Sequence, residues 1–143
     1  MKKLLAVFTL PLLITACQSN GDDEATITAT DLQHHNWNLV QIDGTKFESQ
    51  GNLPVANLEI GEKLSANGNA GCNNFFGQAE LKDNQFRIQQ MGMTQKMCME
   101  EEMNVEMAMG VVLSDWSDMI LTKDTLQLKS DKHTLTFELA DWK

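Results

Sequence analysis

Short stretches in which apolar and polar residues alternate, separated by turn-forming residues, constrain the fold of this chain most strongly. Near its C-terminus, "SDMILT", "TLQLK" and "HTLTFEL" are separated by "KD" and "SDK". Because side chains of a β-strand point alternately to two faces, this period of two predicts three antiparallel strands joined by tight turns. Leu126 and Leu128 should share the buried face of one strand, and Leu135, Phe137 and Leu139 that of the next.

The first half of the chain contains similar stretches. "WNLVQIDG" predicts a strand ended by an Asp-Gly turn, with Val40 and Ile42 on the outer face. "ANLEI" and residues 63–67 predict two more strands, and "QAELK" and "QFRIQ" predict a hairpin across the turn "DN". The side chains expected to face the core are Trp37, Leu39, Leu58, Ile60, Phe86 and Ile88.

The stretch "MCMEEEMNVEMAMG" loses the alternation and is rich in helix-forming residues, which predicts a helix at about 99–114. Met99, Met103 and Met107 are four residues apart, so they lie on one side of that helix, and we expect this stripe to pack in the core. Two alternatives for the methionines from Met91 to Met109 are a Cu(I) site, because thioethers bind soft metals, and a flexible apolar contact surface.

Together these elements predict a mainly β (α+β) fold: a small antiparallel barrel-like or sandwich domain with one inserted helix at about 99–114. "NGNAGCNNFFG", residues 67–77, is dense in glycine and asparagine, and we expect it to form turns. Seven or eight short strands would form a single core, so we expect one domain, residues 31–143.

The first residues resemble a bacterial lipoprotein leader. Lys2 and Lys3 precede an apolar run at residues 4–13, which is shorter than the about 20 residues that span a bilayer. The run ends in "LITAC", which predicts that residues 1–16 are a signal peptide and that Cys17 is lipidated. Since Gln18 is not the aspartate typical of inner-membrane retention in enteric bacteria, we expect an acylated (palmitate-bearing) protein on the periplasmic face of the outer membrane.

Residues 17–30 are polar and predict a flexible tether between the lipid and the domain. The formal charge is −9, and removal of residues 1–16 would make it −11 because two lysines and no acids are lost. This charge argues against nucleic acid as a partner, since phosphates require basic side chains. A basic protein partner remains open, although solubility is the commoner reason for such a charge.

Cys72 and Cys98 remain once Cys17 is lipidated. In an oxidising compartment an even pair predicts a disulfide, which would stabilise the domain by about 3 kcal/mol for a loop of this length. A zinc site is the alternative, but the histidines His34, His35 and His133 are not at recognised ligand spacings, and we expect no metal and no cofactor.

The arrangement of these motifs resembles the META domain, and most closely the HslJ type of heat-shock lipoprotein. The resemblance rests on the opening Trp37-x-Leu39, on Gly71-Cys72-Asn73, and on "MGMTQKMCMEEE" before the helix. The "QHHNW" and "LADW" stretches strengthen it. It implies a small β domain with a helix, an envelope lipoprotein, induction by heat, and a link to novobiocin resistance. It implies no catalytic residues.

No enzyme motif is present in the sequence, and we expect no catalytic activity. His34, His35 and His133 are expected at the surface, and Trp142 is expected to close one end of the barrel, with a contact role as the alternative. The preferred function is a monomeric, non-catalytic outer-membrane lipoprotein of the stress response. The alternative is a periplasmic protein-binding module, such as an inhibitor of a lysozyme-type hydrolase.

Overall fold

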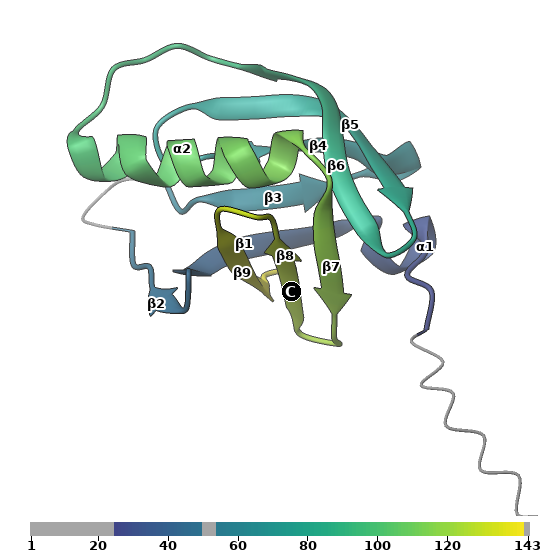
Figure 1. Ribbon diagram of the computed structural model, residues 1–143. Helices are drawn as coiled ribbons and strands as arrows, with labels where there is room; N and C mark the ends of the chain where they lie inside the picture. The colour runs from purple at the N-terminus through teal and green to yellow at the C-terminus, as the bar shows by residue number, and fades with distance from the viewer. Residues whose placement is uncertain (1–24, 50–53, 142–143) are drawn as a thin grey trace, which may run out of the picture.

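The computed structural model describes residues 25–49 and 54–141 of the 143-residue chain, in which nine strands and a long helix follow the expected order (Figure 1). The elements are α1 (Ala29–Leu32), β1 (His35–Ile42), β2 (Thr45–Lys46), β3 (Asn57–Ile60), the 3-10 helix η1 (Glu62–Leu64), β4 (Ser65–Asn69), β5 (Asn74–Lys82), β6 (Gln85–Met93), α2 (Glu100–Ser114), β7 (Ser117–Leu121), β8 (Thr125–Lys129) and β9 (Thr134–Leu139).

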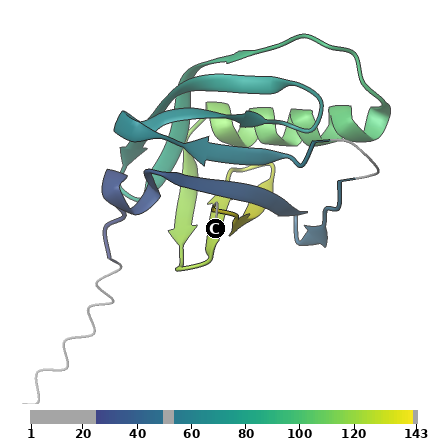
Figure 2. The ribbon, with the colours of Figure 1, turned by 180° about the vertical axis from the view of Figure 1, so that it is seen from behind.

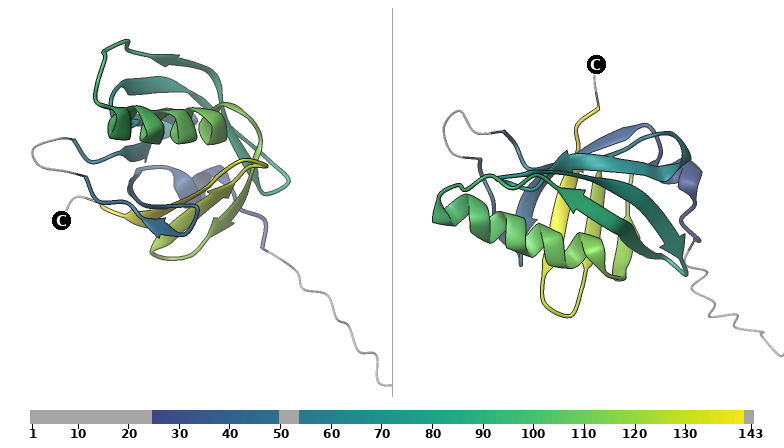
Figure 3. Two further views of the ribbon diagram at one scale, coloured as in Figure 1. Left: turned by 60° about the vertical axis from the view of Figure 1, so that its left-hand side comes forward. Right: turned by 90° about the horizontal axis from the view of Figure 1, so that it is seen from above.

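Within these described residues, eight strands form a closed antiparallel barrel. From β3 to β9 each strand pairs with the next one along the chain, and β1 pairs with both β3 and β9, which closes the sheet. The short β2 adds only a hairpin to β1. Closure removes the free edges that an open sheet would expose. The predicted mainly β fold with an inserted helix is confirmed, and the two sides of the barrel are visible in Figures 2 and 3.

The core is built from the alternating residues of the strands, as the sequence predicts. Its largest side chains are those of Trp37, Phe75, Phe86 and Phe137, and all are buried. Leu139 is half-buried and packs against this cluster. The other predicted core residues that are buried are Leu39, Leu58, Ile60, Ile88, Leu126, Leu128 and Leu135.

One strand departs from strict alternation. Ile42 was expected on the outer face of β1, but it packs against the core. The pairing of β1 with β9 has an irregularity between Leu39 and Gln41, where β1 holds one extra residue. Such a bulge shifts the following side chains to the opposite face, so the prediction for Ile42 is wrong for a local backbone reason.

The glycine- and asparagine-rich stretch forms fewer turns than predicted. Residues 67–69 belong to β4 and residues 74–77 to β5, so only residues 70–73 form the connection between these strands. Asparagines directly opposite one another across the strands explain the difference, since Asn57 pairs with Asn69 and Asn69 with Asn74. Their side chains form hydrogen bonds that offset the low strand propensity of asparagine.

The long helix has the predicted extent but packs with a different face. Met99 and Met107 are 77% and 63% exposed, so the expected burial of the methionine stripe is wrong. From Val105 to Leu113 the helix is apolar on nearly every side, so residue spacing alone is compatible with more than one buried face. The residues that α2 contributes to the core are Val105, Ala108, Met109, Val112 and Leu113.

The ordered fold includes residues from the expected tether. Ile27 packs against the core, and its backbone N–H donates to Asn84 Oδ1 over 2.8 Å. Asp31 Oδ2 accepts hydrogen bonds from the Thr28 backbone N–H and hydroxyl, which caps the short α1. The beginning of α2 and helix α1 lie at opposite ends of the molecule (Figure 1).

Candidate functional site

A disulfide connects the β4–β5 turn to the segment that precedes α2. It joins Cys72 and Cys98, 26 residues apart, and their Cα atoms are separated by 5.8 Å. Cys72 is buried within the turn, and Cys98 lies two residues before α2 begins. The disulfide therefore fixes the end of residues 94–99, which we call the pinned segment.

Asn73 holds the same segment through its side chain. It is only 2% exposed. Its Oδ1 accepts hydrogen bonds from the Thr94 hydroxyl, over 2.9 Å, and from the Lys96 backbone N–H, over 2.6 Å. Its Nδ2 donates to the Lys96 carbonyl over 3.0 Å. A buried amide that bonds to both backbone groups of Lys96 fixes the local path of the chain.

Asn73 also holds helix α2, through Glu106. The backbone N–H of Asn73 donates to Glu106 Oε2 over 2.8 Å, and Nδ2 donates to Glu106 Oε1 over 3.2 Å. Hydrogen bonds to a carboxylate are stronger than those between neutral groups. Since Glu106 is on the second turn of α2, this contact sets how the helix is rotated against the barrel. That rotation buries the face containing Val105 instead of the methionine stripe.

Gly71 allows the helix to approach the turn closely. Its φ is +106°, a conformation that glycine adopts at little cost. A Cβ at this position would lie 3.0 Å from the Glu102 carbonyl oxygen and from Val105 Cβ. The glycine is therefore required both by its backbone angle and by the contact with α2.

A chain of asparagine side chains connects this turn to the neighbouring strands. Asn57 Nδ2 donates to Asn36 Oδ1 over 2.8 Å, and Asn57 Oδ1 accepts from the Asn69 backbone N–H over 2.9 Å. Asn69 Oδ1 then accepts from the Gly71 N–H, and Asn69 Nδ2 donates to Asn74 Oδ1. The turn that carries Cys72 and Asn73 is thus held from β1, β3, β4 and β5. The Gly-Cys-Asn sequence therefore has a structural role beyond the turn geometry that its residue types predict.

The pinned segment presents methionines to solvent. Thr94, Lys96 and Cys98 are held by the contacts described above, whereas the intervening Met97 is 94% exposed and Met99 is 77% exposed. Met107, two turns along α2 from Met99, is 63% exposed. We call Met97, Met99 and Met107 the methionine face. It is an exposed apolar surface on a backbone fixed by a disulfide and a buried asparagine.

A pocket of about 470 Å³ lies beside the first turns of α2. Residues 50–53, which follow the lining residue Ser49 and precede the lining residue Pro54 in the sequence, are outside the described residues. Oε2 of Glu102, one of the lining residues, is buried and has no hydrogen-bond partner among the described residues. The lining residues are Lys46, Phe47, Glu48, Ser49, Pro54, Gly71, Glu101, Glu102, Asn104 and Val105.

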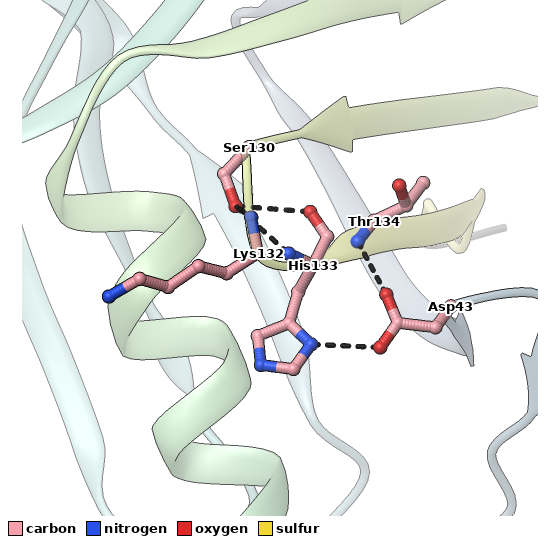
Figure 4. A network of polar contacts seen from close by, with 5 residues as sticks. All are labelled: Asp43, Ser130, Lys132, His133 and Thr134. Atoms are coloured by element: carbon pink, nitrogen blue, oxygen red, sulfur yellow. Dashed lines mark hydrogen bonds and ion pairs between the residues drawn. The ribbon is translucent and has the colours of Figure 1, made fainter.

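Two histidine–aspartate pairs lie at the two ends of the seam, which is the pairing of β1 with β9 that closes the barrel. At one end, His133 Nδ1 lies 2.8 Å from Asp43 Oδ2, while Asp43 Oδ1 accepts from the Thr134 N–H (Figure 4). These hydrogen bonds, that of His133 first, hold the pKa of Asp43 below its ordinary value. Ser130 orders the adjacent turn by accepting from the N–H groups of Lys132 and His133.

The other end of this seam has the same arrangement. His35 Nδ1 lies 2.6 Å from Asp141 Oδ2, and Asp141 Oδ1 accepts from the Asn36 N–H over 2.9 Å. Burial alone would raise the pKa of Asp141, but the hydrogen bonds from Asn36 and His35 outweigh it, so the pKa lies below its ordinary value. His34 is exposed. Sequence reasoning placed these histidines at the surface but did not identify their aspartate partners.

Other features considered from the sequence are either not formed by the described residues or lie outside them. In residues 25–49 and 54–141, no three histidine, cysteine or acidic side chains gather in a group able to hold a metal ion. Among the helices formed by the same residues, none has the length and apolarity to span a bilayer. Cys17, expected to carry lipid, and Trp142, expected at the barrel end, lie outside the described residues.

Comparison with known proteins identifies the family. The META domain matches residues 30–142. "Heat shock protein HslJ" of Escherichia coli (strain K12) is 33% identical over 142 residues, covering 99% of this chain and 98% of that protein. One solved NMR structure, 29% identical, superimposes with a TM-score of 0.71 over 80% of this chain and 97% of its own. Another, from Burkholderia xenovorans and 23% identical, shares the fold with a TM-score of 0.62 over 92% and 99%. Both the domain match and the identity to a heat shock protein over nearly the whole length show that this chain belongs to the META domain family.

Proposed function

We propose that this protein is a non-catalytic outer-membrane lipoprotein of the heat-shock and envelope-stress type, which contributes to novobiocin tolerance. The observation that carries the proposal is the 33% identity to a heat shock protein over 99% of this chain. That alignment includes nearly all of the leader and tether residues as well as the domain. The link to novobiocin is an implication of the resemblance to HslJ-type proteins.

The geometry of the Gly-Cys-Asn turn supports a non-catalytic role. The side chain of Asn73 is fully occupied by Thr94, Lys96 and Glu106. Both oxygens of Glu106 accept from Asn73. A catalytic acid or base must instead be within hydrogen-bond reach of a substrate. These residues serve to hold a surface in place, which is the role expected of a structural or binding domain.

The proposed membrane attachment depends on Cys17. Three acyl chains on this residue would anchor the protein stably, since two chains already suffice. Incorporation of labelled palmitate into the wild-type chain, and its loss in Cys17→Ala, would support the anchor. An unlabelled wild-type protein recovered in the soluble fraction would contradict it.

The proposed role in tolerance requires a genetic test. A deletion strain should be more sensitive to novobiocin and to heat than its parent, and the wild-type gene should restore growth. Cys17→Ala tests whether the anchor is needed. Gly71→Ala, which places a Cβ against α2, tests whether the folded domain is needed. A deletion strain with unchanged novobiocin and heat survival would refute the proposed role.

A second candidate, a periplasmic protein-binding module such as a lysozyme-type hydrolase inhibitor, is favoured by the methionine face and the acidic charge. Exposed apolar side chains on a fixed backbone are a common feature of binding surfaces. Stoichiometric inhibition of a basic lysozyme by the full chain would support this candidate. Unchanged lysozyme activity in the presence of excess protein would exclude that target.

A further inference from the structure

No other described residue covers the methionine face, and the segment of the chain that contains it is rich in acidic residues. Met97, Met99 and Met107 are among the most exposed large apolar side chains of the described residues. Between Arg87 and Lys123 the chain has six acidic residues and a single basic one, Lys96. Helix α2 has four glutamates and no lysine or arginine. The exposed methionines therefore belong to a segment of the chain with a net negative charge, and Glu100 lies next to them on α2.

The methionine face has the geometry that another helix can pack against. Met99, at the N-cap of α2, is followed at intervals of four residues by Met103 and Met107, so these side chains form a continuous row along one side of α2. Rows with this spacing fit into the grooves between side chains of a second helix. Methionine side chains are flexible and polarisable, so they adapt to partners of different shape.

The backbone beneath this row is fixed before any partner arrives. The disulfide holds Cys98, and Asn73 holds Thr94 and Lys96, on either side of Met97. Binding to a preorganised surface avoids much of the entropy lost when a flexible segment becomes ordered. A partner that covered Met97 would therefore gain apolar contact without having to order the segment beneath it.

We propose that the methionine face binds a basic amphipathic helix of a partner polypeptide, whose apolar side packs on the methionines and whose lysines or arginines face Glu100 at the start of α2. Charge determines this choice of partner. A second copy of this chain carries the same formal charge of −9 and would bring the glutamates of two helices together, which is unfavourable. The proposal is independent of the lipid anchor and of novobiocin tolerance.

The test uses the full chain in a non-ionic detergent and three fluorescein-labelled 18-residue peptides. One is an amphipathic Leu/Lys helix, the second replaces every lysine by glutamate, and the third replaces every leucine by serine. Anisotropy should show binding of the Leu/Lys peptide, at least tenfold weaker binding of the other two, and weakening by salt, because exposed charges are screened. Equal binding of the Leu/Glu peptide would overturn the proposal.

Variants locate the binding surface. The triple variant Met97→Gln/Met99→Gln/Met107→Gln should raise the dissociation constant at least tenfold and leave the fold intact, because all three side chains are exposed. Ile120→Gln, at a 55% exposed apolar residue on β7, is the matched control and should change the constant less than twofold. Glu100→Gln should reduce the salt dependence. Equal effects of the triple variant and the control would contradict the proposed location.

Methionine methyl NMR gives a residue-level readout that nonspecific adhesion would not reproduce. The ε-methyl signals of Met97, Met99 and Met107 should shift on addition of the Leu/Lys peptide, while those of the buried Met109 and Met119 should not. Shifts of similar size at buried and exposed methionines, or no shifts on the methionine face, would refute the proposal. Dimerisation in sedimentation that the triple variant abolishes would identify a second copy as the occupant instead.

Discussion

Replacement of Asn73 by alanine should destabilise the domain more than any comparable asparagine substitution. The change removes five side-chain hydrogen bonds: three with Thr94 and Lys96, one to the Glu106 carboxylate, and a weak one to Cys72 Sγ. A neutral hydrogen bond contributes about 1 kcal/mol net, and one to a charged group about 1.5–3 kcal/mol. Since Thr94 and Lys96 are exposed, water can replace part of this loss, and we expect a decrease of about 3–5 kcal/mol in the free energy of unfolding.

Urea unfolding of the full chain, followed by tryptophan fluorescence, measures this difference. The control is Asn38→Ala, at a half-buried asparagine of β1 that forms no side-chain hydrogen bond with the described residues. It should cost less than about 1 kcal/mol. If Asn73→Ala cost no more than the control, Asn73 would not be the residue that holds the pinned segment and α2.

Asn73→Asp separates the charge contribution from the side-chain size. The substitution replaces Nδ2, which lies 3.2 Å from Glu106 Oε1, by a carboxylate oxygen. Two negatively charged groups would then face each other. Such a pair binds a proton more readily in the folded state than in the unfolded chain. The variant should therefore gain stability relative to wild type as the pH falls from 7 toward 5. A difference from wild type that does not change with pH would refute the assigned contact.

Three other predictions concern separate parts of the molecule. Reduction of the disulfide should lower the free energy of unfolding by about 3 kcal/mol, as measured by urea unfolding with and without reductant; an unchanged midpoint would contradict a stabilising crosslink. The folded-state pKa values of Asp43 and Asp141 are lowered, so their stabilising effect is complete above the ordinary value of 3.8 and is lost as the pH falls through the lower folded values. In Asp43→Asn the free energy of unfolding should therefore decrease less below pH 4 than in the wild type. The same pH dependence in both proteins would argue against the pair with His133. Mild peroxide should oxidise the methionine face before Met109 and Met119, as measured by peptide mass spectrometry; uniform oxidation would contradict the assigned burial.

The strands could be predicted from the sequence because each is encoded locally. Alternation places Phe86, Leu126 and Phe137 in the core wherever the backbone is regular. The prediction fails at Ile42, where a bulge changes the face without changing the residue pattern. The closure of the barrel between β1 and β9 depends on pairing across nearly the whole domain, and a local pattern does not contain that information.

The face of α2 illustrates a different limit. The spacing of the methionines is helical, and it correctly predicts that they share one side, but not whether that side is buried. The orientation is set by Glu106, which bonds to Asn73, 33 residues earlier in the chain, and by the contact of Val105 with Gly71. The pair His35 and Asp141 is likewise separated by 106 residues. Such contacts depend on tertiary structure, and the residue types alone do not identify the partners.

Amide hydrogen exchange at Lys96 tests most directly the claim that Asn73 fixes the pinned segment. In the wild-type chain the Lys96 N–H donates to Asn73 Oδ1 over 2.6 Å, so it should exchange slowly although Lys96 itself is exposed. In Asn73→Ala this amide should exchange rapidly while the amides of β8 and β9 keep their protection. Rapid exchange of the Lys96 amide in the wild-type protein, or unchanged protection in the variant, would contradict the account.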